Sequence, residues 1–276
     1  MIHPQIAAFA RLANGAQLPQ RKIEGASTLL ARTVHSIEYD AIHDEISVPQ
    51  GFAGAVLTFR GDSSGEVAPL RVIQGPKTQI GDPSRLATDP ANNEIYVPLG
   101  SRVLVFPREG NGNIAPTRIL EGPDTQLGAG ALAVDALHNL LIAVGNPGGG
   151  GPSRGTQILM FDRTASGNAK PLRVVGGPKT KLTTTGGPFT IYAPKGRILV
   201  PIRGDIPTSE MMAPDSFLGV WNESDNGDVA PHWTIGGPRG VFEMIRGVAV
   251  NAKYKEVIVS DKRLNAVLTF SVPEIF

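Results

Sequence analysis

Three aspartates occupy equivalent places in a recurring sequence pattern and are the first side chains that would suit a metal ion. Asp40, Asp89 and Asp135 each follow a short apolar run, and Asn251 takes the same place in a fourth repeat. An Asp or Asn side chain at such a point also closes a tight turn by accepting backbone N–H groups. Because that structural role accounts for all four residues, we expect them to close turns and not to bind a ligand.

The other chemistry-bearing residues form no recognisable site. The chain has no cysteine and five histidines, and no two histidines have the His-x-His or His-x₃-His spacing favoured by metal sites. There is no Gly-x-Ser-x-Gly motif, and the glycines at 148–151 lack the Lys-Ser/Thr of a phosphate-binding loop. We therefore predict no catalytic, cofactor-binding or metal-binding residues. The histidines are His3, His35, His43, His138 and His232.

Two Arg-Gly-Asp triplets, at 60–62 and 203–205, match a receptor-binding signal of some extracellular proteins. The first triplet lies where the next repeat has Arg108, Glu109 and Gly110, and the motif arises readily by chance in a chain with 33 glycines. We therefore expect no receptor role for either triplet.

These side chains lie within an internal sequence repeat, and the repeat must determine how the fold positions them. Five segments run without gaps from an aromatic residue through a proline ten residues later to a glycine, with aromatic-to-aromatic spacings of 50, 47, 55 and 60 by subtraction. The segments begin at Phe9, Phe59, Phe106, Phe161 and Trp221 and end at Gly25, Gly75, Gly122, Gly177 and Gly237.

Between these segments lie pairs of short β-runs joined by polar turns, so each repeat predicts a four-stranded meander with strands a, b, c and d. A unit of this kind is typical of a β-propeller blade. We expect an all-β single domain over 1–276 with five blades, or six if one is incomplete, closed by an N-terminal strand that pairs with the C-terminal blade. The expected repeat blocks are 26–75, 76–122, 123–177, 178–237 and 238–276, with further strands from 1–25.

The chain resembles the NHL-type β-propellers and their bacterial secreted relatives. The resemblance rests on the strand a turn aspartate, the aromatic that ends strand c, and the Asn-Gly or Ser-Gly loop before the proline, as at 111–112 and 166–167. It implies the propeller fold and an extracellular or periplasmic location. Members of the family include binding modules, lyases and calcium-dependent lactone hydrolases, so the resemblance does not imply one activity.

The repeat also assigns structural roles. The aromatic residues, with Phe270, are predicted to be buried wedges between blades, and each repeat glycine is predicted to have positive φ in a blade-to-blade turn, with no helix between Gly122 and Leu132. The strand d arginines are expected on the surface or between blades; they are Arg21, Arg71, Arg118 and Arg173.

The departures from the repeat supply the candidate binding residues. The connections at 145–156 and 203–216 are long, and variable loops on a rigid scaffold commonly bind partners. Tolerated surface insertion is the plain alternative. The candidates in these loops are Arg154, Arg203, Asp205, Met211 and Met212.

A strand count gives a second departure. The pattern predicts 21 strands, from 2 + 16 + 3, and five blades need 20, so one strand c is surplus. A five-bladed ring would leave the strand with Ile6, Ala8 and Phe9 without a partner in its own subunit, whereas six blades would leave the first and last incomplete. Alternatively, this strand folds back on its own subunit or is mobile. Unpaired edges invite strand addition by another chain.

The net charge and the absence of long apolar runs limit the classes of partner that we expect. The formal charge is +1 and no run reaches the ~18 apolar residues of a spanning helix, so we expect neither nucleic-acid binding nor membrane insertion. We predict a non-enzymatic module that binds itself, in an oligomer or head-to-tail filament, or another protein. The alternative is a propeller enzyme of the lactonase or lyase type, with its active site at the top of the central channel.

Overall fold

The structure is a computed structural model that describes residues 4–32, 34–146, 155–185, 187–203, 216–237 and 240–276. The chain divides into an N-terminal unit, residues 1–97 and 104–117, and a C-terminal unit, residues 98–103 and 118–276. The regular elements of the described residues are β-strands and single turns of 3-10 helix, which confirms the predicted all-β class.

The N-terminal unit begins with a hairpin of strands β1 and β2 and continues into blade 1, a four-stranded antiparallel sheet of β3 to β6 in chain order. Strands β7 to β10 form blade 2, with β7 paired to β8, and β10 falls in the residue range of the C-terminal unit. The bounds are β1 Gln5–Ala8, β2 Arg21–Glu24, β3 Glu38–Asp40, β4 Glu45–Gln50, β5 Ala55–Arg60, β6 Arg71–Gln74, β7 Ala87–Asp89, β8 Glu94–Leu99, β9 Arg102–Pro107 and β10 Arg118–Glu121.

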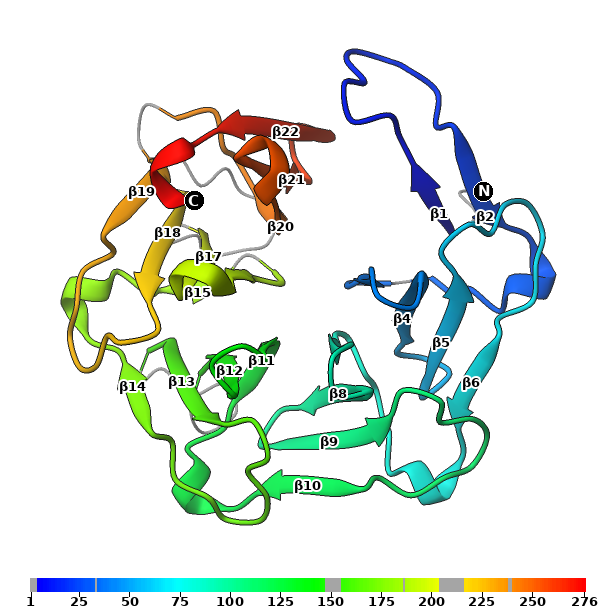
Figure 1. Ribbon diagram of the computed structural model, residues 1–276, viewed down its shortest axis with the longest axis horizontal. Coiled ribbons are helices and arrows are strands. Elements are labelled where there is room, and N and C mark those ends of the chain that lie inside the picture. The colour runs from blue at the N-terminus through cyan, green and yellow to red at the C-terminus, as the bar shows by residue number, and fades with distance from the viewer. Residues whose placement is uncertain (1–3, 33, 147–154, 186, 204–215, 238–239) are drawn as a thin grey trace. The chain divides into compact units, whose positions relative to one another are not determined.

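The C-terminal unit contains three further sheets, which Figure 1 shows in green, yellow and red. Blade 3 is β11 to β14; blade 4 is β15 to β19, where β15 and β16 both pair with β17; blade 5 is the three strands β20 to β22. The bounds are β11 Ala129–Asp135, β12 Leu140–Gly145, β13 Gln157–Asp162, β14 Arg173–Val175, β15 Thr184–Thr185, β16 Thr190–Tyr192, β17 Arg197–Arg203, β18 Phe217–Asn222, β19 Trp233–Gly236, β20 Ile245–Asn251, β21 Glu256–Asp261 and β22 Ala266–Ser271.

The hairpin β1–β2 is a c–d pair like those of the blades. Ile6 pairs with Ile23 as Val56 pairs with Ile73 in blade 1, and the same register recurs in blades 3 and 4. The predicted strand with Ile6, Ala8 and Phe9 therefore folds back on β2 in its own chain, so the expectation of an unpaired strand is wrong. Its backbone groups find partners because the repeat fixes the c–d register wherever both strands are present.

Neighbouring blades are joined by a backbone bridge from strand d to the glycine of the next c–d loop. Within the N-terminal unit Ile23 bridges Gly65, and the Gly65 N–H donates to the carbonyl of Lys22 at 2.6 Å. Gly65 has a φ of 80°, which a residue with a Cβ rarely adopts. The equivalent bridges are Ile73 to Gly112, Leu120 to Gly167 and Val175 to Gly227.

The glycines that end strand d have positive φ, as predicted, with 130° at Gly122. The expectation of no helix after Gly122 is wrong, because Pro123–Thr125 forms one turn of 3-10 helix (η3). The turn is stabilised by the buried Thr125 hydroxyl, which donates to the Gly122 carbonyl at 2.6 Å. The same threonine contact recurs after Gly25, Gly75 and Gly177.

Two of the strand d arginines, Arg21 and Arg173, contact the next blade as expected, whereas Arg71 pairs within its own blade. Arg71 pairs with Glu45 inside blade 1, and Arg21 donates to the Gly61 carbonyl of that blade from the hairpin. Arg173 of blade 3 donates from Nε to the carbonyl of Glu223 in blade 4 at 2.6 Å.

The buried wedges are confirmed for four of the six aromatic residues. Phe59, Phe106, Phe161 and Trp221 are 0% exposed, and Phe270 is partly buried against blade 4 and blade 5 side chains. Phe9 is 53% exposed, so its prediction as a core wedge is wrong. Among the described strands β1 pairs with β2 alone, so no further strand of the same sheet covers this ring.

We therefore predict unequal effects for one truncation at two equivalent positions. Phe161→Ala should lower the free energy of unfolding by about 3–5 kcal/mol, because it opens a cavity in a closed core. Phe9→Ala should cost less than about 1 kcal/mol, because its ring is half exposed. Urea unfolding of both variants at low protein concentration measures the difference, and equal losses would contradict the assigned burial.

Candidate functional site

The turns between strands a and b begin with the repeated aspartates, and the turn-closing role is confirmed for these three residues. It is wrong for Asn251 in blade 5, whose side chain accepts no backbone N–H of the turn and whose Nδ2 donates to Glu256 Oε2 at 3.2 Å instead. Oδ1 of Asp40 accepts the His43 N–H at 2.9 Å, and Oδ1 of Asp89 accepts the Asn92 N–H at 3.1 Å. Asp135 accepts the His138 N–H at 2.9 Å in the same way. These carboxylates therefore hold the turns, and each keeps Oδ2 for a second contact.

In blade 3 this second contact extends into a cluster of three side chains, Asp135, His138 and Glu223. His138 Nδ1 lies 2.9 Å from Asp135 Oδ2 and 3.0 Å from Glu223 Oε2. The three atoms all lie within 4.8 Å of one another. Asp135 and His138 belong to blade 3, whereas Glu223 follows β18 of blade 4, so the cluster joins two blades of the C-terminal unit.

In this cluster the two carboxyl groups are buried, and only the histidine side chain is exposed to solvent. The side chains of Asp135 and Glu223 are 0% and 8% exposed, compared with 44% for His138. Burial and the neighbouring Asp135 raise the pKa of Glu223. The hydrogen bond to Asp135 raises the pKa of His138. One proton or cation must therefore offset the charge of these carboxylates.

Glu223 and Gly196 of blade 4 replace an arginine–asparagine pair that is found in blades 2 and 3. The residue two positions after the aromatic is arginine in three repeats, and in blades 2 and 3 its Nε donates to an asparagine, from Arg108 to Asn93 at 2.8 Å and from Arg163 to Asn139 at 3.2 Å. In blade 4 the pair is Gly196 and Glu223. Because Gly196 has no side chain, the Glu223 carboxylate has no equivalent of this asparagine to bind, and it contacts His138 of the preceding blade instead.

Sequence reasoning missed this cluster because its members are far apart in the chain and lie in different blades. The signal was present in the repeat itself, where Glu223 reverses the charge of Arg11, Arg108 and Arg163. Only the structure shows that this position meets the a–b turn of the preceding blade.

The sequence-predicted binding residues are only partly covered by the structure. Arg154, Asp205, Met211 and Met212 lie outside the described residues. Ile6 and Ala8 lie in β1, where they pair with Ile23 and Arg21.

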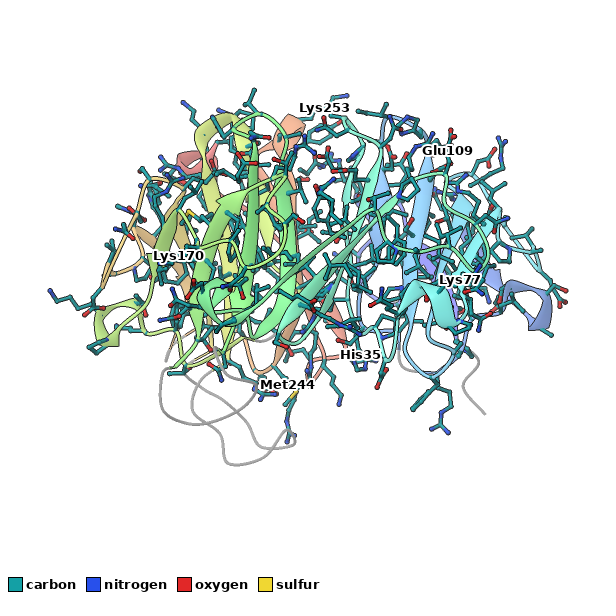
Figure 2. All side chains as sticks on the ribbon, turned by 90° about the horizontal axis from the view of Figure 1, so that it is seen from below. His35, Lys77, Glu109, Lys170, Met244 and Lys253 are labelled. Carbon is teal, nitrogen blue, oxygen red and sulfur yellow. The ribbon has the colours of Figure 1, made fainter. Side chains whose placement is uncertain are left out.

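Arg203 ends β17, and burial and the neighbouring Arg246 guanidinium lower its pKa. Arg246 stands at an irregularity in the pairing of β20 with β21. Figure 2 places Met244, which precedes β20, and Lys253, in the a–b turn, at opposite faces of the C-terminal unit. Arg203 stands at the end of β17 and Arg246 near the start of β20, so each lies at the strand end away from the a–b turn.

The first Arg-Gly-Asp triplet is paired internally. Arg60 Nε lies 3.0 Å from Asp62 Oδ1, and both side chains are exposed.

Glu38, in the innermost strand of blade 1, is a second carboxyl group in an unusual environment. Burial raises its pKa to about 8 from an ordinary value of 4.5. The folded chain therefore holds a proton that the unfolded chain releases, and Glu38 weakens stability as pH rises from about 4.5 to about 8.

We predict that Glu38→Gln flattens this fall. The melting temperature of the variant should match wild type near pH 4.5 and exceed it increasingly toward pH 8, because the amide needs no proton. Glu121→Gln, at an exposed position of β10, serves as control and should follow wild type. Parallel pH profiles for wild type and Glu38→Gln would contradict the assigned burial.

Comparison with known proteins identifies the fold. No family model and no curated protein matches the chain. The β-propeller domain of Myceliophteria thermophila Cps50 (Swd1) matches with a TM-score of 0.55 and 11% identity, over 89% of this chain and 67% of that one. The chain is thus an all-β protein with a five-bladed β-propeller fold, a fold common among protein-binding modules. Among the described residues, no helix is long and apolar enough to cross a membrane.

Proposed function

We propose that the chain is a non-enzymatic β-propeller module, extracellular or periplasmic, that assembles head to tail with copies of itself through its terminal strands. One observation carries the proposal: among the described strands, the hairpin and blade 5 together have two c strands, β1 and β22, but one d strand, β2. The extracellular or periplasmic setting follows the resemblance to secreted NHL-type proteins.

Strand β22 has the sequence of a complete blade's c strand. Residues 266–270 and 55–59 both read Ala-Val-Leu-Thr-Phe. In blade 1 this strand pairs with β6 and Val56 is 1% exposed, whereas Val267, at the same position of β22, is 66% exposed. In the C-terminal unit, β22 pairs with β21 alone among the described strands. Its outer edge therefore suits an added strand.

Strand β2 is not free to supply that addition. Its c-side edge pairs with β1 over four residue pairs, from Gln5–Glu24 to Ala8–Arg21. Its position on blade 1 is fixed by the Ile23–Gly65 bridge. While β1 stays on β2, β22 must find another strand.

The partner that fits is the open edge of β1 in a second copy. An edge strand offers backbone donors and acceptors to any strand of matching length, without specific side-chain chemistry. The contact joins different surfaces of the two copies, so it repeats head to tail. Burial of Val267 and the exposed Phe9 would add about 25 cal/mol per Å² of apolar surface removed from water.

Deleting residues 1–12 tests the proposal. Wild type should give a particle mass that rises with concentration above the 29.1 kDa of one chain. The deletion frees the c-side edge of β2, so β2 should pair with β22 of its own chain, since intramolecular pairing has the higher effective concentration. The deleted chain should stay monomeric, keep its β-sheet circular dichroism and melt at a higher temperature.

The matched control is Leu18→Ala, in the same hairpin at an 87% exposed position outside the strands. It should assemble as wild type does, which separates strand pairing from unspecific apolar contact. A wild-type chain that stays monomeric at every concentration, or a deleted chain that assembles as well as wild type, would show the proposal to be wrong. Sedimentation equilibrium gives the masses.

A further inference from the structure

The structure points to a second property that does not depend on assembly: we propose that Asp135, His138 and Glu223 bind one divalent transition-metal ion of the Zn²⁺ class, which cross-links blades 3 and 4.

The three donor atoms are gathered as a metal site requires. His138 Nδ1 lies 2.9 Å and 3.0 Å from the two carboxylate oxygens, Asp135 Oδ2 and Glu223 Oε2. Ligands bound to Zn²⁺ at 2.0–2.2 Å in tetrahedral geometry are about 3.4 Å apart. The histidine nitrogen therefore needs to separate from each carboxylate oxygen by only a few tenths of an ångström, and all three donor atoms already lie within 4.8 Å of one another.

A second observation points to a missing cation. Oε1 of Glu223 is buried and has no hydrogen-bond partner among the described residues, and the residue is only 6% exposed. A buried carboxylate oxygen without a donor is costly, and a metal ion held by Oε2 would neutralise the carboxylate to which Oε1 belongs. The absence of a side chain at Gly196 adds space, since a Cβ there would lie 3.3 Å from Glu223 Oε2.

The donor set selects the ion. One imidazole with two carboxylates suits zinc and its neighbours, whereas calcium and magnesium prefer oxygen ligands alone. His138 is 44% exposed, so an ion reaches the cluster from solvent and keeps water at its remaining positions. In blade 1, the turn with Asp40 and His43 has the same aspartate–histidine contact at 2.7 Å. There Arg108 stands at the position that matches Glu223, so that turn should bind no metal.

The experiment uses the full chain without a histidine tag, stripped with EDTA and titrated with ZnCl₂ by calorimetry near neutral pH. We expect one Zn²⁺ per chain and a melting temperature that rises with free Zn²⁺, because the ion binds the folded state. MgCl₂ and CaCl₂ should give no comparable shift. Because both readouts are made at low protein concentration, they do not depend on self-association.

Three variants separate a built site from stray histidine binding. His138→Ala and Glu223→Gln should weaken Zn²⁺ binding by about tenfold or more and abolish the thermal shift. Glu223→Gln should also melt higher than wild type without metal, because it removes a buried carboxylate. His43→Ala should leave the stoichiometry and affinity unchanged.

The proposal is wrong if wild type binds no stoichiometric Zn²⁺, if Glu223→Gln keeps wild-type affinity, or if His43→Ala weakens binding as much as His138→Ala. Far-ultraviolet circular dichroism of each variant establishes folding. If a change at the buried Glu223 prevents folding, His138→Ala still tests the proposal, because His138 is partly exposed and its replacement should leave the chain folded.

Discussion

The backbone bridge between strand d and the next c–d loop is the contact on which the rest of the structure depends. It sets the spacing of neighbouring blades within each unit, and it requires a glycine with positive φ, such as Gly65 at 80° or Gly227 at 84°. Once two blades are joined there, the aromatic at the end of strand c is enclosed and the a–b turn of one blade meets the loop of the next. Inter-blade packing and the Asp135–His138–Glu223 cluster both follow from that one arrangement.

Much of this architecture could be predicted because it repeats. The gapless interval from Phe59 to Gly75 requires a fixed loop and a fixed c–d register, and the structure has both. The single turn of 3-10 helix after Gly122 was not foreseen, because its cause is a threonine hydroxyl bound to a carbonyl and not a periodic apolar pattern. Phe9 was misjudged for the opposite reason: its sequence fits the repeat, but burial depends on neighbouring strands, and the described sheet that holds β1 contains only β2 beside it.

The candidate site was beyond sequence reasoning alone. His138 and Asp135 look like any turn pair, as His43 and Asp40 do, and nothing local indicates a third group. Glu223 is 85 residues after His138, by subtraction, and meets it only because adjacent blades stack. The repeat still marks the place: a position that is otherwise arginine or glycine in the equivalent loops becomes glutamate, with Gly196 beside it in place of asparagine.

The register shared by β1–β2 and the c–d pairs of the blades has a consequence for how the chain is encoded. The register is set by the pairing within each c–d unit, so the hairpin should keep it wherever the hairpin is placed in the chain relative to the blades. In a permuted chain with residues 1–25 placed after Phe276, β22 and β1 would become consecutive strands of one kind. Such a chain would place β22 and β1 side by side in the sequence before the one d strand β2, and would show which of the two c strands β2 pairs with.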